Sequence, residues 1–336
     1  MLCPLCGSDA VLVHAGLAGY QAPARFDVYD CGLCGAEFSW PMSGGEAIYE
    51  RIYRSIKSIP GYSRYLSYAE NVAKQASPLD YLANKEESYW ATAVTLRALR
   101  ERSGRQLKVL DVGSGMGYLT YALHRDGFDV KGVDVSRKAV ETAESRFGRL
   151  FVCSSLEDLL HEGPGFDVVI LNQLVEHVVD VRSLLENAVK VASPSGRILV
   201  TTPNRSFSRN GAVWETDLPP VHYWWFSERS LEYISGHLGC DLELFDFSGF
   251  YSAHYVRENR AIFPSANARR HFLDSNGEPC IKLQPPPMDW WLERLAEKVG
   301  GAGGYRTVRE SLTGERRISG KRGRVSCAIL TKGVGK

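Results

Sequence analysis

The stretch that decides the fold is VLDVGSGMG at residues 109–117. It begins as a short apolar run, which indicates a buried strand, and ends in three glycines before a helical stretch that continues to Arg125. Glycines at such a junction allow a tight turn and let a ligand approach the backbone at a helix amino end. We therefore expect a ligand-binding loop here. The loop departs from the G-x-G-x-x-G dinucleotide fingerprint, because Tyr118 stands where the fingerprint, counted from Gly113, has its third glycine.

Around this loop the chain alternates between apolar strands and helices. Helices are expected from Ser136, as a cap, to Phe147 and over 181–192 and 228–238. The expected strands cover residues 107–112, 128–133, 150–153, 167–171, 197–202, 241–247 and 325–331. Such alternation indicates a parallel sheet covered on both faces. The sequence therefore predicts an α/β fold with a Rossmann-like, seven-stranded, mostly parallel sheet, whose ligands bind at the carboxyl ends of the strands.

An acidic residue stands where the second strand ends. Asp134 lies 19 residues beyond Gly115, and a carboxylate at that place accepts both hydroxyls of a ribose. The alternative role for Asp134 is that of a helix-capping acid in front of Ser136. Together with the glycine loop, the position favours the ribose role.

Four of the eight cysteines form two pairs, Cys3 with Cys6 and Cys31 with Cys34, with 24 residues between them. Two such pairs, each followed by glycine, supply four thiolates in a tetrahedron, which suits Zn²⁺. We expect a zinc ribbon over residues 1–42, with a strand at 26–30; a redox dithiol and chance spacing are the alternatives. A closed four-sulfur site has a structural role. The other cysteines are isolated.

Composition narrows the function. The 336 residues are 44% hydrophobic and 24% charged, with a formal net charge of +1, which argues against a broadly basic nucleic-acid binder. The sequence contains no apolar run of 18 residues, so no transmembrane helix is expected. The amino terminus lacks the charged and apolar regions of a signal peptide. We therefore expect a cytoplasmic protein that does not bind membranes.

Several motifs in the right order resemble one family. Residues 109–117 look like the first motif of class I S-adenosylmethionine-dependent methyltransferases, and VKGVDVS at 130–136 resembles their second-strand motif. FDVVILN at 166–172, followed by Glu176 and His177, is similar to the fourth-strand motif, and residues 194–204 resemble the fifth-strand region. His222 and the Phe-Ser pair at 226–227 fit the subgroup that contains the ubiquinone-pathway O-methyltransferases. The resemblance covers about residues 85–256.

The resemblance implies S-adenosylmethionine as the cofactor. Gly113 and Gly115 would cradle its amino acid end, and Asn172 would offer backbone to its ammonium group. Ser155 and Leu156 would flank the adenine, although the family often has an acid where Ser155 stands. The full set expected to bind the cofactor is Asp111, Gly113, Ser114, Gly115, Gly117, Asp134, Val135, Ser155, Leu156 and Asn172.

The same resemblance places two catalytic candidates after the fourth strand. His177 is the expected base for an acceptor hydroxyl, because imidazole titrates near neutral pH, and Glu176 would orient it or bind the acceptor. The alternative is that both residues support a loop. Some relatives carry Glu-x-x-Glu-His and a later His that bind a divalent ion. Here Gln173 replaces the first carboxylate, which weakens a site made of Glu176, His177 and His222.

The expected domains are the ribbon at 1–42, a helical linker at 43–104, the methyltransferase core at 105–256, and an insertion with the final strand at 257–336. The tyrosines of the linker and the aromatic run at 219–226 either pack in the core or line the acceptor site. The insertion contains prolines at 285–287, a glycine run at 300–304 and seven basic residues within 306–324; it forms either a surface excursion or part of the acceptor site.

The leading hypothesis is an enzyme that methylates a hydroxyl of a small-molecule acceptor such as a sugar, a quinone-like compound or a secondary metabolite. The alternative is an RNA methyltransferase whose ribbon contacts nucleic acid, a layout that resembles rRNA guanine methyltransferases. The fourth-strand motif lacks the Asn/Asp-Pro-Pro-aromatic sequence of base-methylating relatives. A non-catalytic cofactor-binding scaffold is the third option. The sequence does not reveal the acceptor or the oligomeric state.

Overall fold

A computed structural model describes residues 1–43, 45–54, 56–57, 59, 62–207, 217–256, 271–280, 292, 295–296, 298–299, 301, 303–305 and 317–333. The prolines at 285–287 lie outside the described residues, and so do parts of the glycine run and of the basic run. No helix among the described residues is long and apolar enough to cross a membrane.

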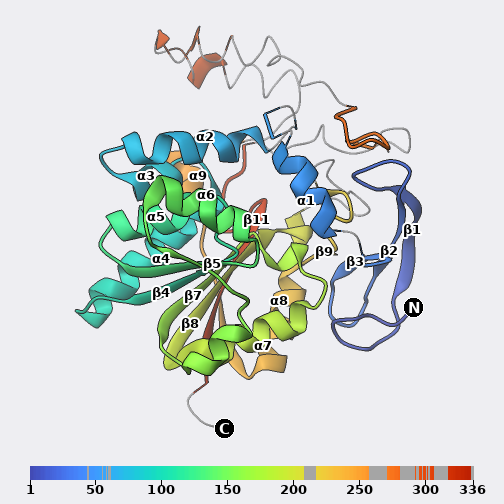
Figure 1. The fold of residues 1–336 in the computed structure, drawn as a ribbon, viewed down its shortest axis with the longest axis horizontal. Helices are drawn as coiled ribbons and strands as arrows, with labels where there is room; N and C mark the ends of the chain where they lie inside the picture. The colour runs from blue at the N-terminus through green and yellow to red at the C-terminus, as the bar shows by residue number, and fades with distance from the viewer. Residues whose placement is uncertain are drawn as a thin grey trace.

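A seven-stranded sheet forms the centre of the molecule (Figure 1). Its order is β10-β11-β8-β7-β4-β5-β6, and only the pairings made by β11 are antiparallel. The strands are β4 (Lys108–Val112), β5 (Asp129–Asp134), β6 (Phe151–Cys153), β7 (Phe166–Asn172), β8 (Ala192–Pro203), β10 (Cys240–Leu244) and β11 (Val325–Lys332). This confirms the predicted fold class.

Helices cover both faces of this sheet. They are α2 (Ser63–Asn71), α3 (Pro78–Ala83), α4 (Glu87–Ser103), α5 (Tyr118–Arg125), α6 (Arg137–Phe147), α7 (Val181–Val191), α8 (Glu228–Leu238) and α9 (Ser248–Ala253). A further helix, α1 (Gly45–Arg54), packs through Ile48 and Ile52 with residues of the N-terminal segment. Alternate residues of each strand point to opposite faces. Thus Val168 and Ile170 of β7 pack with α3, α4, α5 and α9, whereas Val169 and Leu171 pack with α7 and α8.

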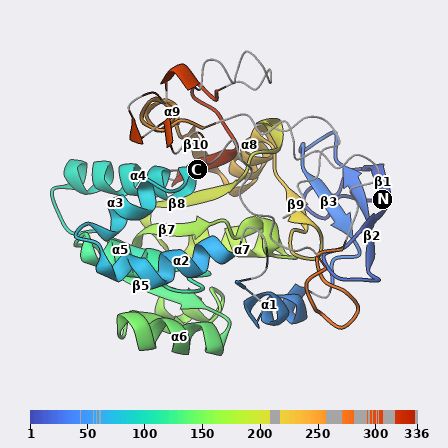
Figure 2. The same cartoon turned by 90° about the horizontal axis from the view of Figure 1, so that it is seen from above.

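A second, four-stranded sheet holds the N-terminal segment. Its order is β1-β2-β3-β9, with β1 (Val11–Ala18), β2 (Arg25–Asp30), β3 (Glu37–Trp40) and β9 (Trp224–Trp225). The fourth strand therefore comes from the middle of the chain, beyond the fifth strand of the large sheet. Both cartoon views place this sheet at one end of the molecule, beside α1 (Figures 1 and 2).

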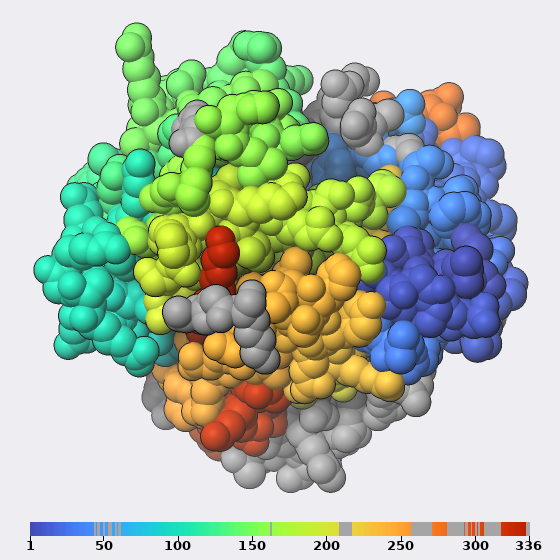
Figure 3. All heavy atoms as spheres, turned by 90° about the horizontal axis from the view of Figure 1, so that it is seen from below, coloured from blue at the N-terminus to red at the C-terminus, as the bar shows by residue number. Residues whose placement is uncertain are grey.

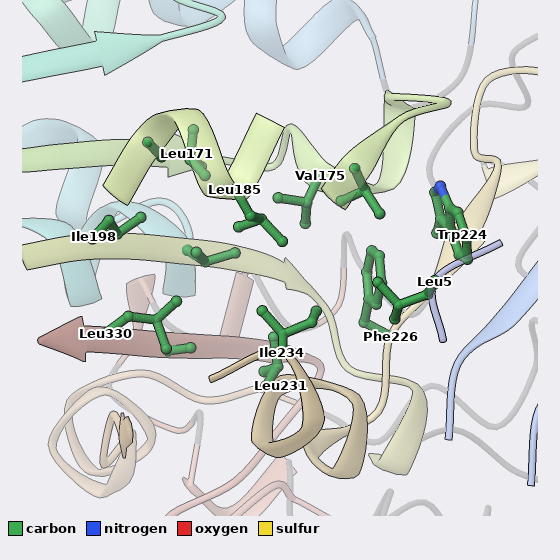
Figure 4. Packing of buried hydrophobic residues seen from close by; sticks show 14 of the residues in the cluster. Leu5, Leu171, Val175, Leu185, Ile198, Trp224, Phe226, Leu231, Ile234 and Leu330 are labelled. Carbon is green, nitrogen blue, oxygen red and sulfur yellow. The ribbon is translucent and has the colours of Figure 1, made fainter. Parts of the chain in front are cut away.

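The two sheets share one hydrophobic core. Leu5 and Phe38 of the N-terminal segment belong to the same buried cluster as Val175 and Trp224, and Trp224 lies near Leu5 and Phe226 (Figure 4). The space-filling view shows blue N-terminal atoms directly against the gold atoms of α8 (Figure 3). The aromatic residues at 223–226 are all buried, so of their two expected roles the structure shows core packing.

Some boundaries differ from expectation. Strand β8 begins at Ala192, five residues before the expected start, and its pairing with β7 shifts register between Phe166 and Val168. The turn-forming residues before Gly196 therefore join the strand as an irregular extension. Helix α6 begins as predicted, because the Ser136 hydroxyl accepts a hydrogen bond from the Ala139 amide.

Candidate functional site

The glycine loop is held by backbone hydrogen bonds to the neighbouring strand. The amides of Gly113 and Ser114 donate to the Val133 carbonyl at 2.8 and 3.0 Å. Gly113, Gly115 and Gly117 all have positive φ, between 50° and 78°, which L-residues with side chains adopt only with strain. The loop thus exposes backbone at the carboxyl end of β4 and leads directly into α5.

Asp134 faces this loop from the end of β5. Its Oδ2 accepts the Gly115 amide at 2.9 Å, and its Oδ1 accepts the Ser136 amide at 2.8 Å. Each carboxylate oxygen keeps a free lone-pair direction after one such bond. The Ser136 contact fits the capping role, and the remaining lone pairs leave the ribose role compatible with this geometry as a prediction.

Asp111 lies behind the loop, only 2% exposed. Its Oδ2 accepts the Thr120 hydroxyl at 2.6 Å. Burial raises the pKa of Asp111 to about 7, against the opposing effect of the Thr120 hydrogen bond. This hydrogen bond joins β4 to α5, the two elements that the glycine loop connects.

The residues expected near the adenine differ in how far their side chains are exposed and free to contact a ligand. Val135 is 78% exposed, whereas Leu156 is buried in the core shared by the two sheets. The Ser155 hydroxyl donates to Asp158 at 2.7 Å and accepts the Asp158 amide at 3.1 Å. The Ser155 side chain is thus already engaged in a local turn.

The carboxyl end of β7 approaches the glycine loop. The Leu174 side chain fills the space next to Gly113, because a Cβ added to Gly113 would lie 2.8 Å from Leu174 Cδ1. The Asn172 side-chain oxygen accepts the Thr201 hydroxyl at 2.8 Å. Among the residues that the structure describes, Gln173 is the only non-glycine residue with a positive φ, at 51°. Strained backbone of this kind gathers at functional sites, but the sequence carries no signal for it.

Glu176 follows in a short 3-10 helix, η3 (Val175–His177), and is 1% exposed. Its two carboxyl oxygens are sealed from solvent and lack a hydrogen-bond partner among the described residues. Burial raises the pKa of Glu176 to about 8. Glu176 Oε1 lies 3.9 Å from His177 Nε2, which is too far for a hydrogen bond. Burying an acid without hydrogen bonds costs free energy, so this side chain is a candidate for contact with a ligand.

His177 is held in one orientation. Its Nδ1 lies 2.6 Å from the Val221 carbonyl oxygen and 2.7 Å from the hydroxyl of Tyr49 in α1. Two acceptor atoms at 2.6 Å would repel each other, so Nδ1 carries a proton and donates to Val221. Burial lowers the pKa of His177 to about 3. The ring is therefore neutral near pH 7 with Nε2 unprotonated, but it is much less basic than the free imidazole on which the predicted base role depended. From sequence, Tyr49 is one of the linker tyrosines that either pack in the core or line the acceptor site, and nothing singles it out.

His222 completes the group. Its ring centroid lies 4.5 Å from that of His177, and its Nδ1 is 3.8 Å from Asp217 Oδ2. One ligand atom each from Glu176, His177 and His222 lie within 4.8 Å of one another. The structure thus brings together the three residues of the proposed divalent-metal variant.

The four paired cysteines also come together. Sγ of Cys3 lies 3.7 Å from that of Cys34, and Sγ of Cys6 lies 3.4 Å from that of Cys31. All four sulfurs lie within 4.8 Å of one another. A tetrahedral Zn²⁺ with sulfur at about 2.3 Å needs sulfur atoms about 3.8 Å apart, so the donor set and spacing fit zinc.

These features define a Rossmann-like α/β protein with a ligand site at the carboxyl edge of its sheet. Residues 82–244 match the family model of the methyltransferase domain. This part of the chain is therefore a methyltransferase domain, which confirms the family that the sequence motifs resemble.

Known proteins of similar sequence agree with this assignment. The chain is 37% identical over 117 residues to a ubiquinone biosynthesis O-methyltransferase of Caulobacter sp. (strain K31), which covers 32% of this chain and 46% of that protein. It is also 29% identical over 142 residues to the ubiquinone biosynthesis O-methyltransferase of Coxiella burnetii. That matched region covers 41% of this chain and 57% of the Coxiella protein. The chain thus spans about half the length of these relatives.

A solved structure is also similar. It is a SAM-dependent methyltransferase of Thermotoga maritima, described as a possible histamine N-methyltransferase, with 15% identity and a TM-score of 0.45. The superposition covers 86% of this chain and 100% of that one. At this level of similarity, the fold assignment rests on the strand order described above.

Proposed function

We propose that the protein is an S-adenosylmethionine-dependent methyltransferase that acts on a hydroxyl of a small-molecule acceptor. The observation that carries the proposal is the meeting of two features at one sheet edge. One is the glycine loop with Asp134, and the other is the Glu176–His177 pair after β7. Leu174 packs against Gly113 and precedes Glu176 by two residues, so the two features are neighbours.

Different residues bind the cofactor and accept the proton of the acceptor. The glycine loop and Asp134 bind the cofactor's amino acid and ribose, with Ser114, Gly117, Val135, Ser155, Leu156 and Asn172 around them. Bound S-adenosylmethionine supplies a sulfonium methyl group for in-line transfer to the acceptor oxygen, with the S–C electron pair returning to sulfur. Much of the catalysis is then positioning. His177 Nε2 accepts the hydroxyl proton, and Val221 holds the ring in the tautomer that makes this possible. Because burial lowers the pKa of His177 to about 3, the proton leaves as the oxygen–methyl bond forms, when the acceptor oxygen has become strongly acidic.

A divalent cation is the second candidate for activating the acceptor. Glu176, His177 and His222 present three ligand atoms within 4.8 Å. The carboxyl oxygens of Glu176, which make no hydrogen bond within the described part of the chain, suit a hard cation. In that variant His177 would be a ligand. A dependence of methyl transfer on added Mg²⁺ or Mn²⁺ would support it.

The described part of the basic run weighs against nucleic acid as the acceptor. Arg317 donates to the Tyr251 carbonyl and Lys321 pairs with Asp246 at 3.5 Å. Arg322 and Arg324 pair with Glu228 and Glu87 at 3.2 and 2.9 Å. These four cations are thus engaged within the protein. Arg306, Arg309 and Arg316 lie outside the described residues.

The experiment is methyl transfer from S-adenosylmethionine labelled in its methyl group to a bacterial cell extract separated into small-molecule and RNA fractions. The proposal predicts labelled product in the small-molecule fraction. His177→Gln should lower the rate by about 10²–10⁴, the usual contribution of a general base, while His237→Gln, on the exposed face of α8, should not. Label confined to RNA would support the alternative, and unaltered turnover by His177→Gln would exclude the base role.

A further inference from the structure

The N-terminal ribbon packs against the segments that carry the site residues at the end of β7. Trp224 of β9 pairs with Phe38 of β3 in the ribbon sheet. β9 begins two residues after His222. The ribbon sheet is therefore continuous with the segment that carries a site histidine.

Two backbone hydrogen bonds connect the ribbon to Glu176. The Ser39 amide of β3 donates to the Tyr223 carbonyl at 2.8 Å, and the Tyr223 amide donates to the Glu176 carbonyl at 2.8 Å. The Tyr223 hydroxyl also accepts the amide of Gly45, the first residue of α1, at 3.0 Å. Tyr223 is thus fixed by the N-terminal segment on both its backbone and its side chain.

A side chain of the same segment reaches His177. The Tyr49 hydroxyl donates to the Val221 carbonyl at 3.1 Å and lies 2.7 Å from His177 Nδ1. Val221 is the acceptor that fixes the His177 tautomer. Tyr49 therefore acts on His177 directly and through the carbonyl they share.

A buried ion pair ties the ribbon to the loop after β8. Arg205 lies 2.5 Å from Glu37 of β3, and both side chains are at most 10% exposed. The Ser227 hydroxyl, at the start of α8, donates to the carbonyl of Gly35 next to Cys34 at 2.7 Å. These two contacts fix the ribbon against the loop after β8 and the start of α8.

The cofactor side is built differently. The amides of Gly113, Ser114 and Gly115 bond to Val133 and Asp134, which both belong to the large sheet. None of these bonds involves the ribbon. The hydrogen bonds that hold the cofactor half therefore come from the large sheet, and the ribbon meets this half only through the buried core that Val133 and Leu156 share with it.

We propose that the zinc-held ribbon and α1 position the acceptor half of the site, with Tyr49 as the positioning residue of His177, while the cofactor half is independent of them. The proposal rests on the proposed function for the identity of the two halves. It predicts that a loosened ribbon leaves the His177 ring mobile, while the affinity for the cofactor stays unchanged.

The test uses the full chain with ¹⁵N-labelled histidine, and NMR follows the exchange of the His177 Nδ1 proton with solvent, assigned with His177→Gln. Tyr49→Phe should speed this exchange about five- to tenfold, as expected for one hydrogen bond. The matched control is Tyr29→Phe in the ribbon, because the structure gives the Tyr29 hydroxyl no hydrogen bond among the described residues. It should leave the exchange unchanged.

Cys31→Ser removes one zinc ligand and leaves the Glu176, His177 and His222 cluster intact. It should abolish protection of the His177 proton and release zinc, while calorimetry shows an S-adenosylhomocysteine Kd within threefold of wild type. Protection that survives both Tyr49→Phe and the loss of zinc would overturn the proposal. A parallel loss of cofactor affinity and protection would also overturn it, because the halves would then not be separate. Failure of the wild-type protein to bind S-adenosylhomocysteine would instead refute the proposed function.

Discussion

Replacing Asp134 by alanine should remove most of the affinity for the cofactor. Its two oxygens are aligned by the amides of Gly115 and Ser136 at 2.9 and 2.8 Å, and each is expected to accept one ribose hydroxyl. Hydrogen bonds to a charged group contribute about 1.5–3 kcal/mol each. Loss of two such bonds corresponds to a 10²–10⁴-fold increase in Kd at about 1.4 kcal/mol per factor of ten.

The assay is calorimetric titration with S-adenosylhomocysteine. Asp134→Asn keeps the shape and one acceptor oxygen, so its Kd should lie between those of wild type and alanine. The matched control is Asp129→Ala, since Asp129 begins the same strand and is exposed. Binding by Asp134→Ala within threefold of wild type would refute the assignment of the ribose site, and an equal loss in Asp129→Ala would show an effect on folding.

Two further predictions concern the support of the loop. Gly117→Ala should lower the free energy of unfolding, measured by urea denaturation, by about 1–3 kcal/mol more than Gly104→Ala. Both glycines are in the left-handed region, with φ 78° and ψ −2° at Gly117 and φ 63° and ψ 14° at Gly104, but a Cβ at Gly117 would lie 2.6 Å from an aromatic carbon of Phe151, whereas nothing lies within 4 Å at Gly104. Equal losses would contradict the packing argument. Asp111, with its pKa raised to about 7 by burial, binds its proton more tightly in the folded than in the unfolded chain, so its contribution to stability falls as pH rises from about 4 to about 7, on the order of 4 kcal/mol. Asp111→Asn should flatten that slope in urea denaturation across this range, and an unchanged slope would exclude Asp111 as its source.

The large sheet could be predicted because its signals are local. The apolar runs of the strands, the glycine loop after β4 and Asp134 after β5 are all features of residues that are near one another in sequence. The Glu176 and His177 pair was found through the family motif, and its contact with His222 follows from the shared sheet edge.

The ribbon's connection to the site could not be predicted in the same way. The pairing of Phe38 with Trp224 joins residues far apart in sequence, and a two-residue strand leaves no periodic pattern. The aromatic residues of that segment therefore suited the wall of an acceptor site as well as a core. Tyr49 was one of many tyrosines in its region, and nothing local distinguishes the one that contacts His177.

The most direct test of the central claim is a crystal structure of the protein with S-adenosylhomocysteine. The account predicts the ribose hydroxyls on Asp134 and the sulfur atom open toward the side of the site formed by Glu176 and His177. A nucleoside bound away from Asp134, or a sulfur atom that faces away from His177, would contradict it.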